Sequence, residues 1–139
     1  MMPSPMLYRL LMAALAVSGV AQMPIFKRYG ISSVPGLSWT ADYAFTHHMH
    51  YVAAAGLLFL LGYALASRGA AALGRARLVM LGVLAATGAV RMLKNLPDVS
   101  FSPQSTMLVD WTHLGAAMAM GLGALALALS RRKPKTIRR

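Results

Sequence analysis

Four stretches of the chain are almost continuously apolar, and each has close to the roughly 20 residues that a helix needs to cross a bilayer. These predicted spans cover about 7–23, 41–66, 76–96 and 108–129. Pro24 ends the first and Pro97 the third, and Gly, Pro or Ser is frequent in the connections 24–40 and 98–107. The pattern predicts an all-α integral membrane four-helix bundle, a single transmembrane domain over residues 1–139.

The composition agrees with a membrane protein. Of the 139 residues, 58% are hydrophobic and only 12% are charged, whereas soluble domains carry about a quarter charged residues. Cysteine is absent, which excludes disulfides, thiolate-bound metals and covalently attached c-type haem within this chain. The first span has small residues like those of a signal peptide, but no clean small-x-small cleavage site precedes Met23, so we expect a retained helix.

The net charge of +11 is distributed unevenly between the two ends of the spans. One set of ends carries Arg9, Arg68, Arg75, Arg77, Arg131, Arg132, Lys133, Lys135, Arg138 and Arg139, and the other Lys27, Arg28, Arg91 and Lys94. The positive-inside rule predicts that both termini are cytoplasmic and that the longer loops face outward. We therefore expect a multi-pass protein of the bacterial inner membrane, with no nucleic-acid partner and with a basic tail, 130–139, that contacts anionic lipid.

All four histidines lie near the predicted outer ends of the spans. His47 and His50 are three residues apart and share a helix face, from which His48 is turned away by about 100°. His113 begins the fourth span at a similar depth. Histidines on two neighbouring spans can hold a haem iron from both sides, so the pattern predicts one bis-histidine haem b joining the second and fourth spans.

Charged residues near these histidines fit the same hypothesis. Arg91 and Lys94 lie one turn apart at the outer end of the third span and are candidates for binding haem propionates. Asp110 precedes His113 by three residues, and Asp42 lies just before His47. Each carboxylate is a candidate for orienting an imidazole or for relaying a proton when quinol is oxidised.

Other interpretations remain open. The histidines are also suited to hydrogen bonding with a quinone, or to structural pairing with aspartate and interface water. A zinc or copper site built from His47, His48, Met49 and His50 would make the chain a metal-handling membrane protein. A cofactor-free anchor or assembly subunit of a respiratory complex is a further hypothesis. The matched pairs 46–47 and 112–113, both Thr-His, hint at a doubled helical hairpin.

Three segments carry a resemblance to a known family: THHMHY at 46–51, LKNLP at 93–97 and DWTHLG at 110–115. Together with the four spans, they resemble the membrane cytochrome b subunits of formate dehydrogenase, thiosulfate reductase and related quinone-linked complexes. The resemblance implies haem b, exchange of electrons with quinone, and an outward-facing iron–sulfur or cytochrome partner subunit. Family members hold two haems, but the first span here has no histidine and the fourth has one. One haem, in a non-catalytic or quinone-reactive electron-transfer subunit, is therefore expected.

Overall fold

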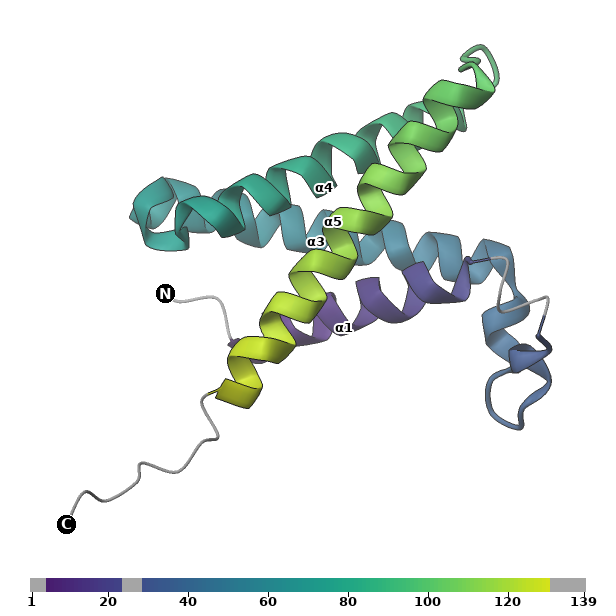
Figure 1. The fold of residues 1–139 in the computed structure, drawn as a ribbon, viewed down its shortest axis with the longest axis horizontal. Helices are drawn as coiled ribbons and strands as arrows, with labels where there is room; N and C mark the ends of the chain where they lie inside the picture. The colour runs from purple at the N-terminus through teal and green to yellow at the C-terminus, as the bar shows by residue number, and fades with distance from the viewer. Residues whose placement is uncertain (1–4, 24–28, 131–139) are drawn as a thin grey trace. The chain divides into compact units, whose positions relative to one another are not determined.

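The computed structural model describes residues 5–23 and 29–130, except for the side chain of Ala72. Within these residues every regular element is helical, which confirms the all-α prediction. The four α-helices are α1 (Pro5–Ala21), α3 (Tyr43–Arg68), α4 (Arg75–Lys94) and α5 (Pro103–Ser130), shown in Figure 1. Short 3-10 turns lie in the connections at Ile31–Ser33, Ser38–Ala41 and Ala70–Leu73.

The chain divides into two compact units, Met1–Gly69 and Ala70–Arg139. The first is a hairpin in which α1 packs antiparallel to α3, and the second is a hairpin in which α4 packs antiparallel to α5. The domain expected over 1–139 is thus made of two helical hairpins, each with its own helix–helix interface.

The helix boundaries follow from local capping chemistry. The Asp42 carboxylate accepts a hydrogen bond from the Phe45 backbone N–H at 2.9 Å and caps the start of α3. Gly69 ends α3 with a φ of +72°, a conformation that glycine adopts without strain. Helix α5 begins before the apolar run of the predicted span 108–129, because Ser102 caps the helix and Pro103 occupies its first position.

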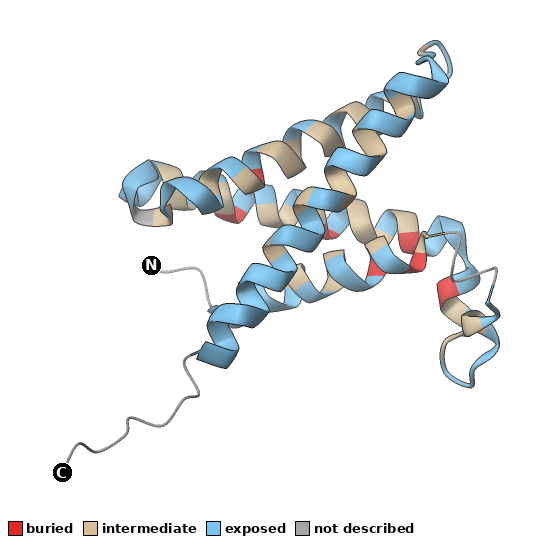
Figure 2. Ribbon diagram, viewed as in Figure 1, coloured by how far each residue is buried: buried red, intermediate tan, exposed pale blue. Residues whose placement is uncertain are grey.

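Three of the helices, α3, α4 and α5, are long and apolar enough to span a membrane, and α1 is a shorter apolar helix of 17 residues. Figure 2 shows that most residues of the helices are exposed or intermediate in the chain alone and that few are buried. The buried residues of the described chain are Ser18, Ala21, Thr40, Thr46, Ala53, Leu60 and Leu81. Large apolar side chains cover the outside of the helices, as in a multi-pass membrane protein whose solvent is lipid.

Helices α1 and α3 approach closely at Gly56. A Cβ atom at this position would lie 3.0 Å from Leu11 Cδ2 and 3.3 Å from Leu11 Cδ1. Small residues at such contacts are how membrane helices pack, because lipid gives them no hydrophobic driving force to associate.

Gly56→Leu is therefore expected to destabilise the first hairpin by about 1–3 kcal/mol, the usual range for overpacking. Gly62→Leu is the matched control, because it lies on the same helix and its added Cβ would meet nothing within 4 Å. Unfolding of both variants in detergent can be followed by circular dichroism. Leu11→Ala should restore much of the loss in Gly56→Leu, and equal losses in the two glycine variants would contradict this packing.

Candidate functional site

In the first hairpin, His50 on α3 faces the end of α1. Its Nδ1 atom lies 2.9 Å from the hydroxyl oxygen of Ser18, a fully buried residue. Its ring lies against Gly19, where a Cβ atom would come within 3.4 Å of His50 Cε1. The imidazole is thus held at one edge by a hydroxyl and packs on the bare backbone of the facing helix.

One turn nearer the α1–α3 connection, Gln22 ties the two helices together. Its amide nitrogen donates to the carbonyl oxygens of Ser18 and Thr46 at 3.2 and 3.3 Å. Its amide oxygen lies 3.4 Å from Nδ1 of His47. The sequence expectation that His47 and His50 share a helix face is confirmed, because both contact α1.

The ring of His47 is also enclosed by aromatic side chains of its own helix. It stacks on Tyr43 with ring centroids 5.2 Å apart, and it lies against Tyr51 at 4.2 Å. This contact set fixes the ring between a glutamine and two tyrosines rather than beside a carboxylate. The Asp42 carboxylate caps α3, and its expected role in orienting His47 stays a prediction.

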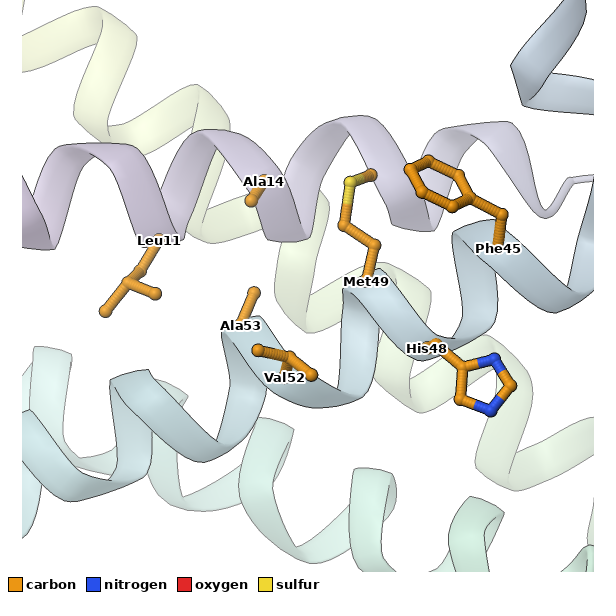
Figure 3. A pocket seen from close by; sticks show the side chains of 7 residues that line it. All are labelled: Leu11, Ala14, Phe45, His48, Met49, Val52 and Ala53. Atoms are coloured by element: carbon orange, nitrogen blue, oxygen red, sulfur yellow. The ribbon is translucent and has the colours of Figure 1, made fainter.

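His48 is in a different environment. It is exposed, and its Nδ1 lies 2.7 Å from the carbonyl oxygen of Ala44 in its own helix. It borders an open apolar groove of about 400 Å³, which is lined by Leu11, Ala14, Phe45, His48, Met49, Val52 and Ala53. Figure 3 shows Phe45 and Met49 directed towards α1, whereas the ring of His48 points away from it.

This divergence weighs against the zinc or copper hypothesis. Nowhere in residues 5–23 and 29–130 do three His, Cys, Asp or Glu side chains gather closely enough to hold a metal ion. His47 and His50 turn towards α1 and His48 turns away from it. The dense run of histidines in the sequence is therefore not a compact ligand cluster.

In the second hairpin, His113 on α5 faces α4 in the same manner as His50 faces α1. Its Nδ1 lies 2.8 Å from the hydroxyl oxygen of Thr87. A Cβ atom on Gly88, the residue after Thr87, would lie 3.6 Å from His113 Cε1. Hydroxyl, glycine and imidazole recur here with nearly the same distances.

One turn nearer the α4–α5 connection, the second hairpin has charged residues. Arg91 Nε lies 3.1 Å from Asp110 Oδ1, and Lys94 Nζ lies 3.7 Å from Asp110 Oδ2. These side chains are between 31% and 41% exposed. Asp110 Oδ1 accepts no hydrogen bond from the described residues, so its contact with Arg91 is an ion pair without a well-directed hydrogen bond.

Two sequence expectations concern the residues of this ion pair. Asp110 was expected to orient His113; its carboxylate lies beside two cations of α4 and Nδ1 of His113 lies beside Thr87, so that role stays a prediction. Arg91 and Lys94 were expected to bind propionates, and here they share one carboxylate and keep a net charge of one. Their role towards a propionate stays a prediction.

The two hairpins therefore have polar residues at corresponding positions, with a neutral contact in the first where the second has an ion pair. Ser18 corresponds to Thr87 and His50 to His113, and one turn away the pair Gln22–His47 corresponds to Arg91–Asp110. The doubled hairpin suggested by the sequence is supported, but in another register. His50, not His47, is the counterpart of His113.

Some of the basic residues from which the orientation is predicted lie outside the described residues. These are Lys27 and Arg28 in the first connection and the basic residues after position 130. The orientation of the termini therefore stays a prediction. The described structure in turn reveals residues that the sequence argument missed: Ser18, Gly19, Gln22, Thr87 and Gly88.

A comparison of the chain with known protein families, curated proteins and solved structures finds no match. What the protein does must therefore be inferred from the chemistry that its two hairpins share.

Proposed function

We propose that the protein is a small membrane cytochrome b subunit that binds haem b through His50 and His113. It passes electrons between membrane quinone and an outward-facing redox partner. The observation that carries this proposal is the repeated arrangement of hydroxyl, glycine and imidazole. Of the three histidines on α3, only His50 occupies the position equivalent to His113.

The donor set suits a b-type haem. The iron of such a haem takes imidazole nitrogens, and a ligating histidine usually has its other ring nitrogen fixed by a hydrogen bond. In both hairpins Nδ1 is engaged by a helix hydroxyl, so ligation would use Nε2. When bound, the haem supplies a one-electron Fe(III)/Fe(II) couple.

The other polar residues assist in different ways. Asp110 offsets part of the charge of Arg91 and Lys94, and the remaining positive charge favours the anionic propionates. Gln22 holds α1 against α3 next to His50. His47, between its tyrosines, is the histidine of the described chain best surrounded for hydrogen bonding to a quinone ring.

The location follows from the distribution of basic residues. Both termini lie in the cytoplasm of a bacterium, and the connections carrying Trp39 and Asp98 face outward. In the first connection and the start of α3, Tyr29 and Tyr43 are 71% and 54% exposed. Such aromatic side chains are typical of protein interfaces and suit the docking of the partner subunit.

A cofactor-free anchor is the second candidate, and these exposed aromatic residues favour it equally. The two candidates differ in cofactor content. An anchor would keep its partner and its stability without any haem, and its histidines would tolerate substitution.

The test is an absorption spectrum of the full-length protein purified in detergent. The reduced protein should show a b-type band, and His50→Ala and His113→Ala should each lower haem affinity by about tenfold or more. His48→Ala is the matched control and should retain the band, because this exposed ring turns away from α1. Protein that shows no b-type band even when haem is supplied would contradict the proposal, and so would equal losses in His48→Ala and His50→Ala.

A further inference from the structure

The hydroxyl groups of Ser18 and Thr87 each have one proton to donate. In each case that proton forms a hydrogen bond to a backbone carbonyl of the same helix. Ser18 Oγ lies 2.6 Å from the carbonyl oxygen of Ala14, four residues earlier on α1. Thr87 Oγ1 lies 2.7 Å from the carbonyl oxygen of Val83, four residues earlier on α4. These are the shorter contacts of each hydroxyl, and a carbonyl can only accept.

The direction of the contact with the imidazole follows. Because the hydroxyl proton points to the carbonyl, the hydroxyl oxygen accepts a hydrogen bond from the histidine. Nδ1 of His50 and of His113 must then carry the proton. In a neutral imidazole with Nδ1 protonated, the lone pair is on Nε2.

We propose that Ser18 and Thr87 are matched positioning residues that hold His50 and His113 in one tautomer, with Nδ1 protonated. The haem-related part of this inference rests on the proposed function, whereas the tautomer does not. The hydroxyls do not touch a cofactor; they act by fixing which ring nitrogen bears the lone pair and how the ring is turned.

The sequence around both hydroxyls supports their equivalence. The segment AVSGVAQM at 16–23 aligns without gaps with AATGAVRM at 85–92. The alignment pairs the hydroxyls, the glycines beside the imidazoles, and Gln22 with Arg91. Both hydroxyls also make a longer contact to the carbonyl three residues earlier, at 3.3 Å in each hairpin. The same local device therefore occurs twice.

Not every hydroxyl in these helices has this role. Thr112 precedes His113 directly, and its hydroxyl donates to the Leu108 carbonyl at 2.7 Å, as Thr87 does to Val83. Thr112 is exposed, whereas Thr87 Oγ1 lies 2.8 Å from Nδ1 of His113, whose imidazole also has a backbone hydrogen bond with Leu84. Thr112→Ala thus removes the same intrahelical hydrogen bond without removing the imidazole contact, which makes it the matched control.

The first measurement is nitrogen NMR on histidine-labelled, full-length protein prepared without haem, with signals assigned from the His50→Ala and His113→Ala variants. Both histidines should be protonated at Nδ1. Ser18→Ala should shift His50 towards a mixture of tautomers and leave His113 unchanged, and Thr87→Ala should do the reverse. Ser18→Thr, Thr87→Ser and Thr112→Ala should leave both histidines as in the parent protein.

The second measurement is the midpoint potential of the haem-loaded protein. When Nδ1 donates a hydrogen bond, the imidazole donates more electron density to the iron through Nε2, which favours the ferric state. Ser18→Ala and Thr87→Ala should each weaken the preference for ferric over ferrous iron about tenfold, which corresponds to a rise of about 59 mV for one electron. Thr112→Ala should not change the midpoint potential. Ser18→Thr keeps a hydroxyl at this position and should have the midpoint potential of the parent protein.

The outcomes separate this inference from the proposed function. Protonation at Nε2 in the parent protein would overturn the positioning role, as would alanine variants at 18 and 87 that behave like Thr112→Ala. If the protein binds haem but these variants change neither tautomer nor potential, the positioning role is wrong and the haem proposal stands. If the tautomers respond as expected in a protein that never binds haem, the positioning role stands and the haem proposal is wrong.

Discussion

Asp110→Arg is expected to destabilise the second hairpin strongly. The substitution replaces a carboxylate that lies 3.1 Å from Arg91 and 3.7 Å from Lys94 with a third cation. Loss of the carboxylate alone should cost about 1–3 kcal/mol, between the values for exposed pairs and for buried pairs that lose one partner. Repulsion among three cations at the edge of a membrane span adds to this loss, because the dielectric there is lower than in water.

The experiment compares unfolding of the variants in detergent, with Asp98→Arg as the matched control. Asp98 lies in the α4–α5 connection and is exposed, so its reversal changes the net charge equally without bringing a cation to the pair of Arg91 and Lys94. The double variant Arg91→Asp with Asp110→Arg restores an opposite pair and should recover much of the stability. If the double variant is no more stable than Asp110→Arg, the ion pair does not hold α4 to α5.

High salt offers an independent check on the same ion pair. The three side chains are partly exposed, so salt should screen their interaction. The difference in stability between the parent protein and Asp110→Arg should therefore shrink as the ionic strength rises. A difference that does not depend on salt would indicate a packing effect rather than an electrostatic one.

Hydropathy was sufficient to predict the four helices, because a membrane span needs a long apolar run whatever its neighbours are. It does not mark the start of α5, where the first turn is formed by polar residues after Pro103. Capping by Ser102 and proline at the first helical position determine that boundary, and neither contributes to an apolar run.

The sequence identified the histidines but not what holds them. Ser18 and Thr87 look ordinary in an apolar helix, where a hydroxyl commonly bonds to its own backbone. They can be found by aligning residues 16–23 with 85–92. In both segments a hydroxyl residue is followed directly by a glycine, and both begin with alanine and end with methionine. Aligning the two Thr-His pairs instead matches His47 with His113, which is the wrong register of the repeat.

The partner of Asp110 was missed for a different reason. Spacing along one helix relates Asp110 to His113, three residues later, but says nothing about the facing helix. The nearest charges are Arg91 and Lys94 on α4, at the same end of the hairpin. Because opposite charges attract more strongly than a carboxylate attracts a neutral imidazole, the contact across the helices prevails over the neighbour in sequence.

Gly88→Val is expected to lower haem affinity by about 10–100-fold, the range found when the residues that support a ligating histidine are lost. A Cβ atom at this position would lie 3.6 Å from His113 Cε1, which is ordinary contact, so Gly88→Ala should bind haem normally. Valine adds two methyl groups beyond Cβ and has one strongly preferred rotamer in a helix, so it cannot easily turn away from the ring. The imidazole must then move, and its hydrogen bond to Thr87 lengthens.

Gly82→Val is the control for this experiment, because Gly82 also lies on α4 and a Cβ atom there would meet nothing within 4 Å. Haem titration of the two valine variants and of Gly88→Ala measures affinity, and the nitrogen signals of His113 report its hydrogen bond to Thr87. Gly19→Val should act on His50 in the same direction, because its Cβ would lie 3.4 Å from His50 Cε1. If Gly88→Val bound haem as tightly as Gly82→Val, the packing of the ring on bare backbone would have no part in ligation. The repeat would then be only a mode of helix packing.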